Sequence, residues 1–400
     1  MEWITTAEAA RRWGVTTRRV QGYCARGRID GAEKFGRSWR IPEGAPKPLD
    51  LRREAQEKSD SCPAARHTVS MDNLMPLMNT AFAPGHARKA AEGFAAGARR
   101  DIALAEYAYF SGNASEAAEV ARPYLESNDL GIRLSACFIC AYANLPLGRI
   151  GHARTCLELA RDVVAEASEK DPRLRAAEGF IAEAASVLLH LPVPESTPDA
   201  REVAPLLPLG LRAFAFYVRA HATYLAGDYA RSLGIAETAL LTQSSVYPIP
   251  TIYLHLVAVM DLMALRQPEK ARGHLLAAWE LAQPDDLIEG FGEHHGLLGG
   301  MLEAVIKPAW PDDFRRIIDI TYRFSAGWRR VHNPATGDDV ADNLTTTEFA
   351  ASMLAARGWT NQEIAQHLGV SVNTVKSYIS SSLSKLGIAS RQDLKNYMLA

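Results

Sequence analysis

The sequence predicts a mostly α-helical protein, in which a long array of helical hairpins is flanked by a small domain at each end. Three observations predict this fold class. Apolar residues recur with helical spacing throughout the Ala- and Leu-rich residues 71–332. Short segments inside that region resemble one another. Polar stretches at residues 49–70 and 333–343 are typical of linkers, and they separate the middle from residues 1–48 and 344–400.

Charge is distributed unevenly along the 400 residues. The net charge is −2, but residues 1–53 contain 12 Lys and Arg against 6 Asp and Glu, and residues 344–400 contain 5 against 3. The middle therefore carries a net charge of −10. Basic ends indicate that the termini bind a polyanion, whereas the acidic middle disfavours DNA and permits a basic partner.

The sequence carries no sign of export or membrane insertion. No apolar run reaches the ~18 residues that a membrane span needs, and the first residues lack the basic start and apolar core of a signal peptide. Five scattered cysteines, an odd number, fit a reducing compartment. We therefore expect a cytoplasmic protein without membrane contact.

The first 48 residues predict two short helices and a β-hairpin. Thr5 and Glu8 form a capping box at the start of one helix. Thr16 caps a second helix over 17–26, and residues 34–41 predict a hairpin that turns at Gly36 and Arg37. Two helices followed by a hairpin form a winged helix-turn-helix.

This N-terminal segment resembles the excisionase/MerR-like winged-helix family in residues 6–10, 13–15, 18–21, 27–32 and 36–42. The resemblance implies DNA binding, and the density of Arg and Lys would neutralise several phosphates. The candidate DNA contacts are Thr16, Thr17, Arg18, Arg19, Gln21, Arg37 and Arg40. The alternative is an interaction module with the same fold that does not bind DNA.

The middle contains four segments that align with one another, residues 105–117, 141–153, 220–232 and 259–271. Each has a small residue, then a break, then a small residue five positions after the break. The breaks are Gly112, Gly148, Gly227 and Arg266. These spacings resemble tetratricopeptide (TPR) repeats, in which small residues lie where two helices cross closely and the break forms the turn between them. A non-repetitive helical bundle is the alternative.

Arrays of this kind bind peptides or proteins on a concave surface. The candidate ligand or partner contacts are Tyr109, Tyr142, Asn144, His221 and Tyr224, although each also fits a role in packing.

The last 57 residues predict four helices from their start and stop signals. The starts are Thr345, Thr360, Ser371 and Ser390, and three of them have a carboxylate three residues later. The stops are Gly358, Gly369 and Gly387. One face of the third helix is apolar. The opposite face carries Asn373, Lys376, Ser377 and Ser380, which are small or flexible enough to approach base edges in a major groove.

This stretch resembles the LuxR/GerE helix-turn-helix family in residues 344–348, 359–365, 370–378 and 385–388 and in Arg391. The resemblance implies that the third helix enters the major groove and that the fourth, Arg391–Met398, makes a dimer contact. The sequence departs from the family at Tyr378, where His is frequent, and in the serine run 380–382. The candidate DNA contacts are Thr360, Asn361, Ser371, Asn373, Thr374, Lys376, Ser377, Tyr378, Ser380, Lys385 and Arg391. The alternative is a helical domain that packs against the rest of the chain and does not touch DNA.

The motifs of common enzymes are missing from the sequence. It has no phosphate-binding loop, nucleophile elbow or dinucleotide fingerprint. Cys137 and Cys140 have a metal-like spacing but lie in an apolar helix, so we interpret them as core thiols. His294 and His295 are interpreted as part of a turn between helices. We expect no catalytic residue, no metal and no cofactor.

The sequence therefore predicts a transcriptional regulator, a homodimer that binds specific double-stranded DNA through its ends and senses an effector or partner through its middle. Two alternatives remain. One is a protein-interaction scaffold that docks a partner such as RNA polymerase, and the other is an accessory protein of a mobile element. The C-terminal domain favours the regulator. The charge distribution adds a hypothesis, in which the acidic middle holds the basic ends in a non-binding arrangement until a ligand remodels it.

Overall fold

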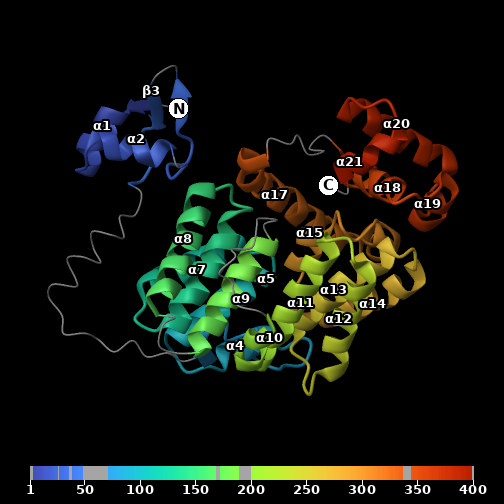
Figure 1. The fold of residues 1–400 in the computed structure, drawn as a ribbon, viewed down its shortest axis with the longest axis horizontal. Coiled ribbons are helices and arrows are strands. Elements are labelled where there is room, and N and C mark those ends of the chain that lie inside the picture. Colours follow the sequence, from blue (N-terminus) through green and yellow to red (C-terminus); the bar gives the residue numbers. More distant parts are fainter. Residues whose placement is uncertain are drawn as a thin grey trace.

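The computed structural model of the chain describes residues 3–25, 27–35, 38–47, 71–167, 172–188, 200–336 and 344–398. Figure 1 shows a small N-terminal domain, a large helical middle and a helical C-terminal domain that lies against the later helices of the middle. The predicted linker at 49–70 and the predicted hairpin turn at Gly36 and Arg37 lie outside the described residues.

The N-terminal domain contains the predicted two helices and two strands, and a further short strand. Its elements are β1 (Trp3–Thr5), α1 (Thr6–Trp13), α2 (Thr17–Ala25), β2 (Glu33–Phe35) and β3 (Ser38–Pro42). The strands pair antiparallel in the order β1-β3-β2, with Ile4 opposite Ile41 and Lys34 opposite Trp39. Buried side chains of both helices and of the hairpin, including Trp13, Val20 and Ile41, form a separate small core.

The middle consists of helices of unequal length that pack in consecutive pairs. They are α4 (Ala87–Glu92), α5 (Ala98–Phe110), α6 (Ala114–Ala121), α7 (Leu130–Asn144), α8 (Ile150–Ala167), α9 (Pro172–Leu188), α10 (Ala200–Val203), α11 (Leu209–Leu225), α12 (Tyr229–Thr242), α13 (Pro248–Ala264), α14 (Pro268–Ala282), α15 (Glu289–His294), α16 (Lys307–Ala309) and α17 (Pro311–Thr336). A π-helical turn over Leu302–Ile306 precedes α16.

The four aligned segments each form a helix, a tight turn and a second helix. The break residues Gly112, Gly148, Gly227 and Arg266 all have φ between 60° and 81°, in the left-handed region. The helices on either side of each break pack together, α5 with α6, α7 with α8, α11 with α12 and α13 with α14. The small residue five positions after each break is fully buried or nearly so: Ala117, Ala153, Ser232 and Ala271. The repeat in the sequence therefore corresponds to a repeat of helical hairpins.

Two expectations about the boundaries and turns of the middle need correction. The predicted linker at 333–343 begins too early, since α17 continues to Thr336. The segment around His294 and His295, interpreted as a turn, contains the helix α15, and both histidines are buried. Contacts with residues distant in the sequence stabilise α15, because its glycines allow the helix backbone to lie close to Tyr253 and Ile320.

The C-terminal domain has four α-helices, which begin at the residues that the sequence predicts or within a turn of them. They are α18 (Thr346–Ala356), α19 (Asn361–Leu368), α20 (Val372–Leu386) and α21 (Leu394–Met398). The last helix is shorter than expected, because Arg391–Asp393 form a 3₁₀ turn ahead of α21.

The middle and the C-terminal domain share one continuous hydrophobic core, which extends from Met71 to Met398. In the described ranges of the chain, no helix is long and apolar enough to cross a membrane.

Candidate nucleic-acid interface

The helix-turn-helix is formed by α19, a three-residue turn and α20. Gly369 ends α19 with φ 67°, and its N–H donates to the carbonyl of Ala365. Two residues later the Ser371 side chain caps α20 by accepting from the N–H of Thr374 at 3.0 Å. A left-handed glycine and a hydroxyl cap can reverse the chain within so few residues, which fixes the angle between the two helices.

The third helix of the domain, α20, has a buried face and an exposed face. Val375 and Ile379 are buried against α18 and α19, and Ser382 is fully buried, with its hydroxyl donating to the carbonyl of Tyr378. The opposite face is exposed and carries Asn373, Lys376, Ser377 and Ser380, as the apolar spacing predicted. Thr374 and Tyr378 flank this face and are partly buried.

Several of the candidate DNA contacts are engaged inside the domain. The ammonium of Lys385 lies 2.7 Å from the Glu348 carboxylate. The guanidinium of Arg391 donates to Asn361 Oδ1 and to the carbonyl of Trp359. The Thr360 side chain accepts from the N–H of Glu363 at 3.2 Å and so caps α19. These four residues therefore form bonds that stabilise the domain itself. Among the described side chains of residues 344–398, Lys376 and Lys395 are exposed cations without an ion pair.

Glu348 is the centre of the network that holds α18 against α20. Burial alone would raise its pKa, but hydrogen bonds from Lys385, Ser381 and the Thr345 amide outweigh burial and lower the pKa to about 2. The carboxylate thus stays charged under all ordinary conditions. It fixes the orientation of α20 relative to α18, and with it the direction of the exposed face.

The N-terminal domain presents a second polar helix face. Thr17, Arg18 and Gln21 on α2 are exposed, and Thr16 caps that helix. Arg19 donates to the Tyr23 hydroxyl. Arg40 pairs with Glu33 at 2.5 Å and lies over the Trp3 ring, so its charge is partly neutralised. Arg37 lies outside the described residues.

The N-terminal domain contacts the start of α8. Asp30 lies 3.0 Å from His152 Nδ1, and a Cβ on Gly151 would lie 2.5 Å from the carbonyl oxygen of Gly27. The glycine therefore permits the close approach of the two backbones.

The C-terminal domain packs on the middle through α18 and α19, and α20 lies on the far side of the domain (Figure 1). Phe349 lies against Gly296, and Leu368 lies against Gly300. His367 Nε2 lies 3.1 Å from the carbonyl oxygen of Gly299. These contacts leave the α20 face open, so the middle does not mask it in this arrangement.

Two charged contacts flank the same junction. Arg266 lies 2.6 Å from the Glu363 carboxylate and stacks over Trp359. Arg357 donates to the Tyr224 hydroxyl, while its Nε and Nη1 atoms are buried without a hydrogen-bond partner in the described part of the chain. Tyr224, proposed from the sequence as a ligand contact, therefore lies at the domain junction.

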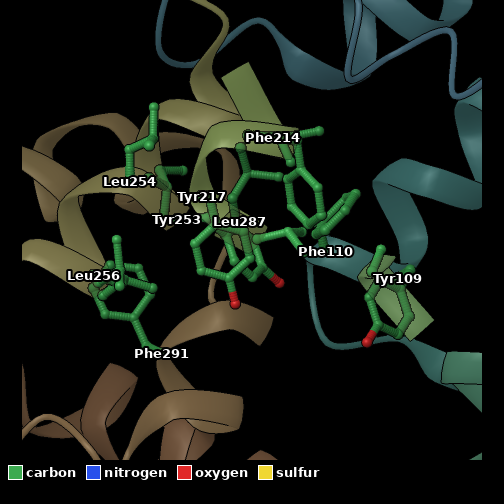
Figure 2. Close-up of a cluster of buried hydrophobic side chains, with 14 of the residues drawn as sticks. Tyr109, Phe110, Phe214, Tyr217, Tyr253, Leu254, Leu256, Leu287 and Phe291 are labelled. Atoms are coloured by element: carbon green, nitrogen blue, oxygen red, sulfur yellow. The ribbon is translucent and has the colours of Figure 1, made fainter. Parts of the chain in front are cut away.

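The other proposed contacts of the middle separate into two groups. Asn144 is buried and donates to the carbonyl of Cys140 at 2.7 Å, a bond that helps to end α7. Tyr109, Tyr142 and His221 belong to a cluster of aromatic side chains from α5, α7 and α11, part of which is shown in Figure 2.

Sequence reasoning missed the acidic members of this cluster. Glu293 accepts hydrogen bonds from the hydroxyls of Tyr109 and Tyr253, and Glu289 lies one turn before it on α15. The signal was present, because the two carboxylates are four residues apart. A turn in this segment would not place the two carboxylates on one side of a helix, so their proximity follows only from the helical geometry of α15.

The comparisons with known proteins bear on the C-terminal domain. Residues 342–398 match the family model of bacterial regulatory proteins of the luxR family. No curated protein and no solved structure matches the chain. The matched residues contain all four C-terminal helices and the exposed face of α20, and the match supports a DNA-binding role in transcriptional regulation for this domain.

Proposed function

We propose that this chain is a sequence-specific DNA-binding transcriptional regulator. The observation that carries the proposal is the exposed, polar face of α20, held by a tight helix-turn-helix inside the luxR-family match. In this proposal Asn373, Lys376, Ser377 and Ser380 face the base edges and phosphates of a major groove. Homodimerisation and contact with RNA polymerase stay predictions of the sequence.

The helical middle is, in this proposal, the part that senses an effector or partner. Its support is the shared core with the C-terminal domain, because a change in the packing of the middle would move α18 and α19 directly. The TPR-like character of the hairpins and the winged helix-turn-helix at the N-terminus belong to the same proposal.

Charge reversal of Lys376 tests the DNA-binding role. A duplex ligand is first selected from random sequences with the full-length chain, and its affinity is then measured by fluorescence anisotropy. Lys376→Glu should weaken binding at least tenfold, because an attraction to phosphate becomes a repulsion. Lys376 is exposed, so the variant should unfold at the same temperature as the parent.

The matched control is Lys270→Glu, the same substitution at an exposed position of α14. It should leave the affinity unchanged. Equal affinities of the two variants, or a failure of the full-length chain to select any duplex, would contradict the proposed function and favour a role as an interaction scaffold.

A further inference from the structure

The middle contains a pair of carboxylates that the DNA-binding role does not use. Glu289 and Glu293 lie one turn apart on α15. Glu289 is 1% exposed, and its Oε1 atom has no hydrogen-bond partner among the residues that the structure describes. Glu293 is partly exposed and is bonded by the hydroxyl of Tyr109 on α5 and, at 2.7 Å, by that of Tyr253 on α13.

Aromatic side chains pack next to this pair, around the Tyr253 ring. Phe110, Phe214 and Tyr217 pack edge-on against Tyr253, with ring centroids 5.0–6.0 Å apart. Figure 2 shows these four side chains next to one another. Burial, followed by the charge of Glu293, raises the pKa of Tyr109, Tyr142, Tyr217 and Tyr253. These tyrosines are therefore neutral at any ordinary pH, and the two glutamates are the acidic groups beside them. The imidazoles of His221 and His294 lie in the same cluster.

Glycines bring the carboxylates into this position. A Cβ on Gly290 would lie 2.9 Å from the Tyr253 ring, and a Cβ on Gly292 would lie 2.4 Å from Ile320 on α17. A Cβ on Gly112 would lie 3.8 Å from Glu289 Oε2. Glycine weakens a helix by about 1 kcal/mol relative to alanine. The glycines that allow α15 to pack closely therefore also lower the intrinsic stability of that helix.

Among the residues that the structure describes, neither carboxylate forms an ion pair with a lysine or an arginine. Burial raises the pKa of both, and the charge of Glu293 raises the pKa of Glu289 further. Arg323 on α17 attracts Glu289, but its side chain is exposed and its Nε donates to the carbonyl of Asp319. A buried carboxyl group such as that of Glu289, with a second carboxyl group one turn away, needs a proton or a cation.

We propose that Glu289, Glu293 and the surrounding tyrosines form the binding site of a small organic ammonium ion. The carboxylates and hydroxyl oxygens would accept its N–H groups, and the aromatic rings would contact its carbon atoms. A metal ion fits less well, because the described residues contain no group of three or more His, Cys, Asp or Glu side chains placed to hold one. The inference rests on the proposed role of the middle as the sensing domain, and it adds the site and the class of effector.

The position of the site gives it a route to the DNA-binding domain. The chain that follows α15 contacts the C-terminal domain at Gly296, Gly299 and Gly300. It then forms the π-helical turn Leu302–Ile306, a geometry that is rare and often found at functional sites. A ligand bound at Glu289 and Glu293 would therefore act on the segment against which α18 and α19 pack.

Isothermal titration calorimetry of the full-length chain tests the site without DNA. The probe is putrescine at pH 8, whose two ammonium groups match the two carboxylates, and 1,4-butanediol is the uncharged control of the same length. We expect saturable binding of one putrescine per chain and no binding of the diol. Glu293→Gln should weaken putrescine binding at least tenfold, while Glu280→Gln at an exposed position of α14 should leave it unchanged.

Two results would overturn the inference. One is the absence of saturable putrescine binding by the parent chain, and the other is equal affinity of the Glu293→Gln and Glu280→Gln variants. If Glu293→Gln does not fold, Glu289→Gln takes its place with the same expectations. Since no DNA is present, loss of this site and loss of the DNA-binding function are separate outcomes.

Discussion

Asp261 has a carboxyl group that is fully buried near the junction of the middle and the C-terminal domain. Neither of its oxygens has a hydrogen-bond partner within the described residues, since the nearby Ser232 hydroxyl donates to the carbonyl of Ala220 instead. Burial raises the pKa of Asp261 to about 8, and the charge of Arg357 offsets only part of that rise. An isolated buried carboxylate is costly when it is charged.

This raised pKa predicts a pH-dependent effect of Asp261→Asn. The ordinary pKa of the group is 3.8, so between about pH 4 and pH 8 the folded chain holds a proton that the unfolded chain has lost. The contribution of Asp261 to stability therefore falls as the pH rises through this window. An asparagine side chain does not titrate. The stability of the variant relative to the parent should therefore increase as the pH rises from 5 to 8.5, measured as the difference between their urea midpoints.

The control for this measurement is Asp72→Asn, which removes an exposed carboxylate. Its urea midpoint should differ from that of the parent by the same small amount at both pH values. If the Asp261→Asn difference is also constant, the group is not titrating in that window.

At the scale of the element, the helix starts of the C-terminal domain were predictable because their signals are local. Thr345, Thr360, Ser371 and Ser390 cap their helices as expected, three of them with a reciprocal carboxylate. Each signal lies within three residues of the group it satisfies. Sequence reasoning therefore finds it without knowledge of the tertiary structure.

Elements and contacts that depend on distant residues were not predictable in this way. The segment around His294 and His295 was expected to form a turn, but contacts with Tyr253 and Ile320 hold α15 as a helix. The sequence shows the charge of Lys385 but not that Glu348, 37 residues earlier, neutralises it. The short strand β1 similarly exists only through its pairing with β3.

The packing of α15 predicts that Gly292→Ala is strongly destabilising. The added methyl group would lie 2.4 Å from Ile320 and 3.1 Å from the backbone oxygen of Ile317, so α17 would have to shift. Overpacking of this kind costs about 1–3 kcal/mol. We expect a clear fall in the free energy of unfolding, measured by urea denaturation.

Gly273→Ala on α14 is the matched control, since a Cβ at that position meets no atom within 4 Å. There the substitution should leave stability unchanged or raise it by up to ~1 kcal/mol, because alanine favours the helix. Equal effects at the two positions would mean that α15 does not pack closely on α17.

At the scale of the whole molecule, the exposed face of α20 limits how DNA binding can be regulated. The hypothesis that the acidic middle holds the basic ends in a non-binding arrangement stays a prediction. The open face of α20 means that such an arrangement does not involve covering that face. The shared core instead places α18 and α19 on the segment from Gly296 to Ile306. Regulation through that junction would change the position of the C-terminal domain rather than uncover its surface.

The two ends of the molecule each present a polar helix face, which predicts that both contribute to the salt dependence of DNA binding. The exposed face of α20 offers few cations, since Lys385 and Arg391 are bonded inside their domain. Arg18 on α2 is exposed and would supply a further phosphate contact. Loss of one such contact lowers the slope of log affinity against log salt concentration by about 0.9.

Arg18→Ala in the full-length chain should therefore reduce that slope by about 0.9, and Lys376→Ala should add a similar reduction when the two are combined. Independent contacts at distant sites contribute additively. Arg231→Ala, at an exposed position of α12 in the middle, should leave the slope unchanged. A slope that responds to Lys376→Ala alone would make the N-terminal domain an interaction module and leave α20 as the DNA-binding element.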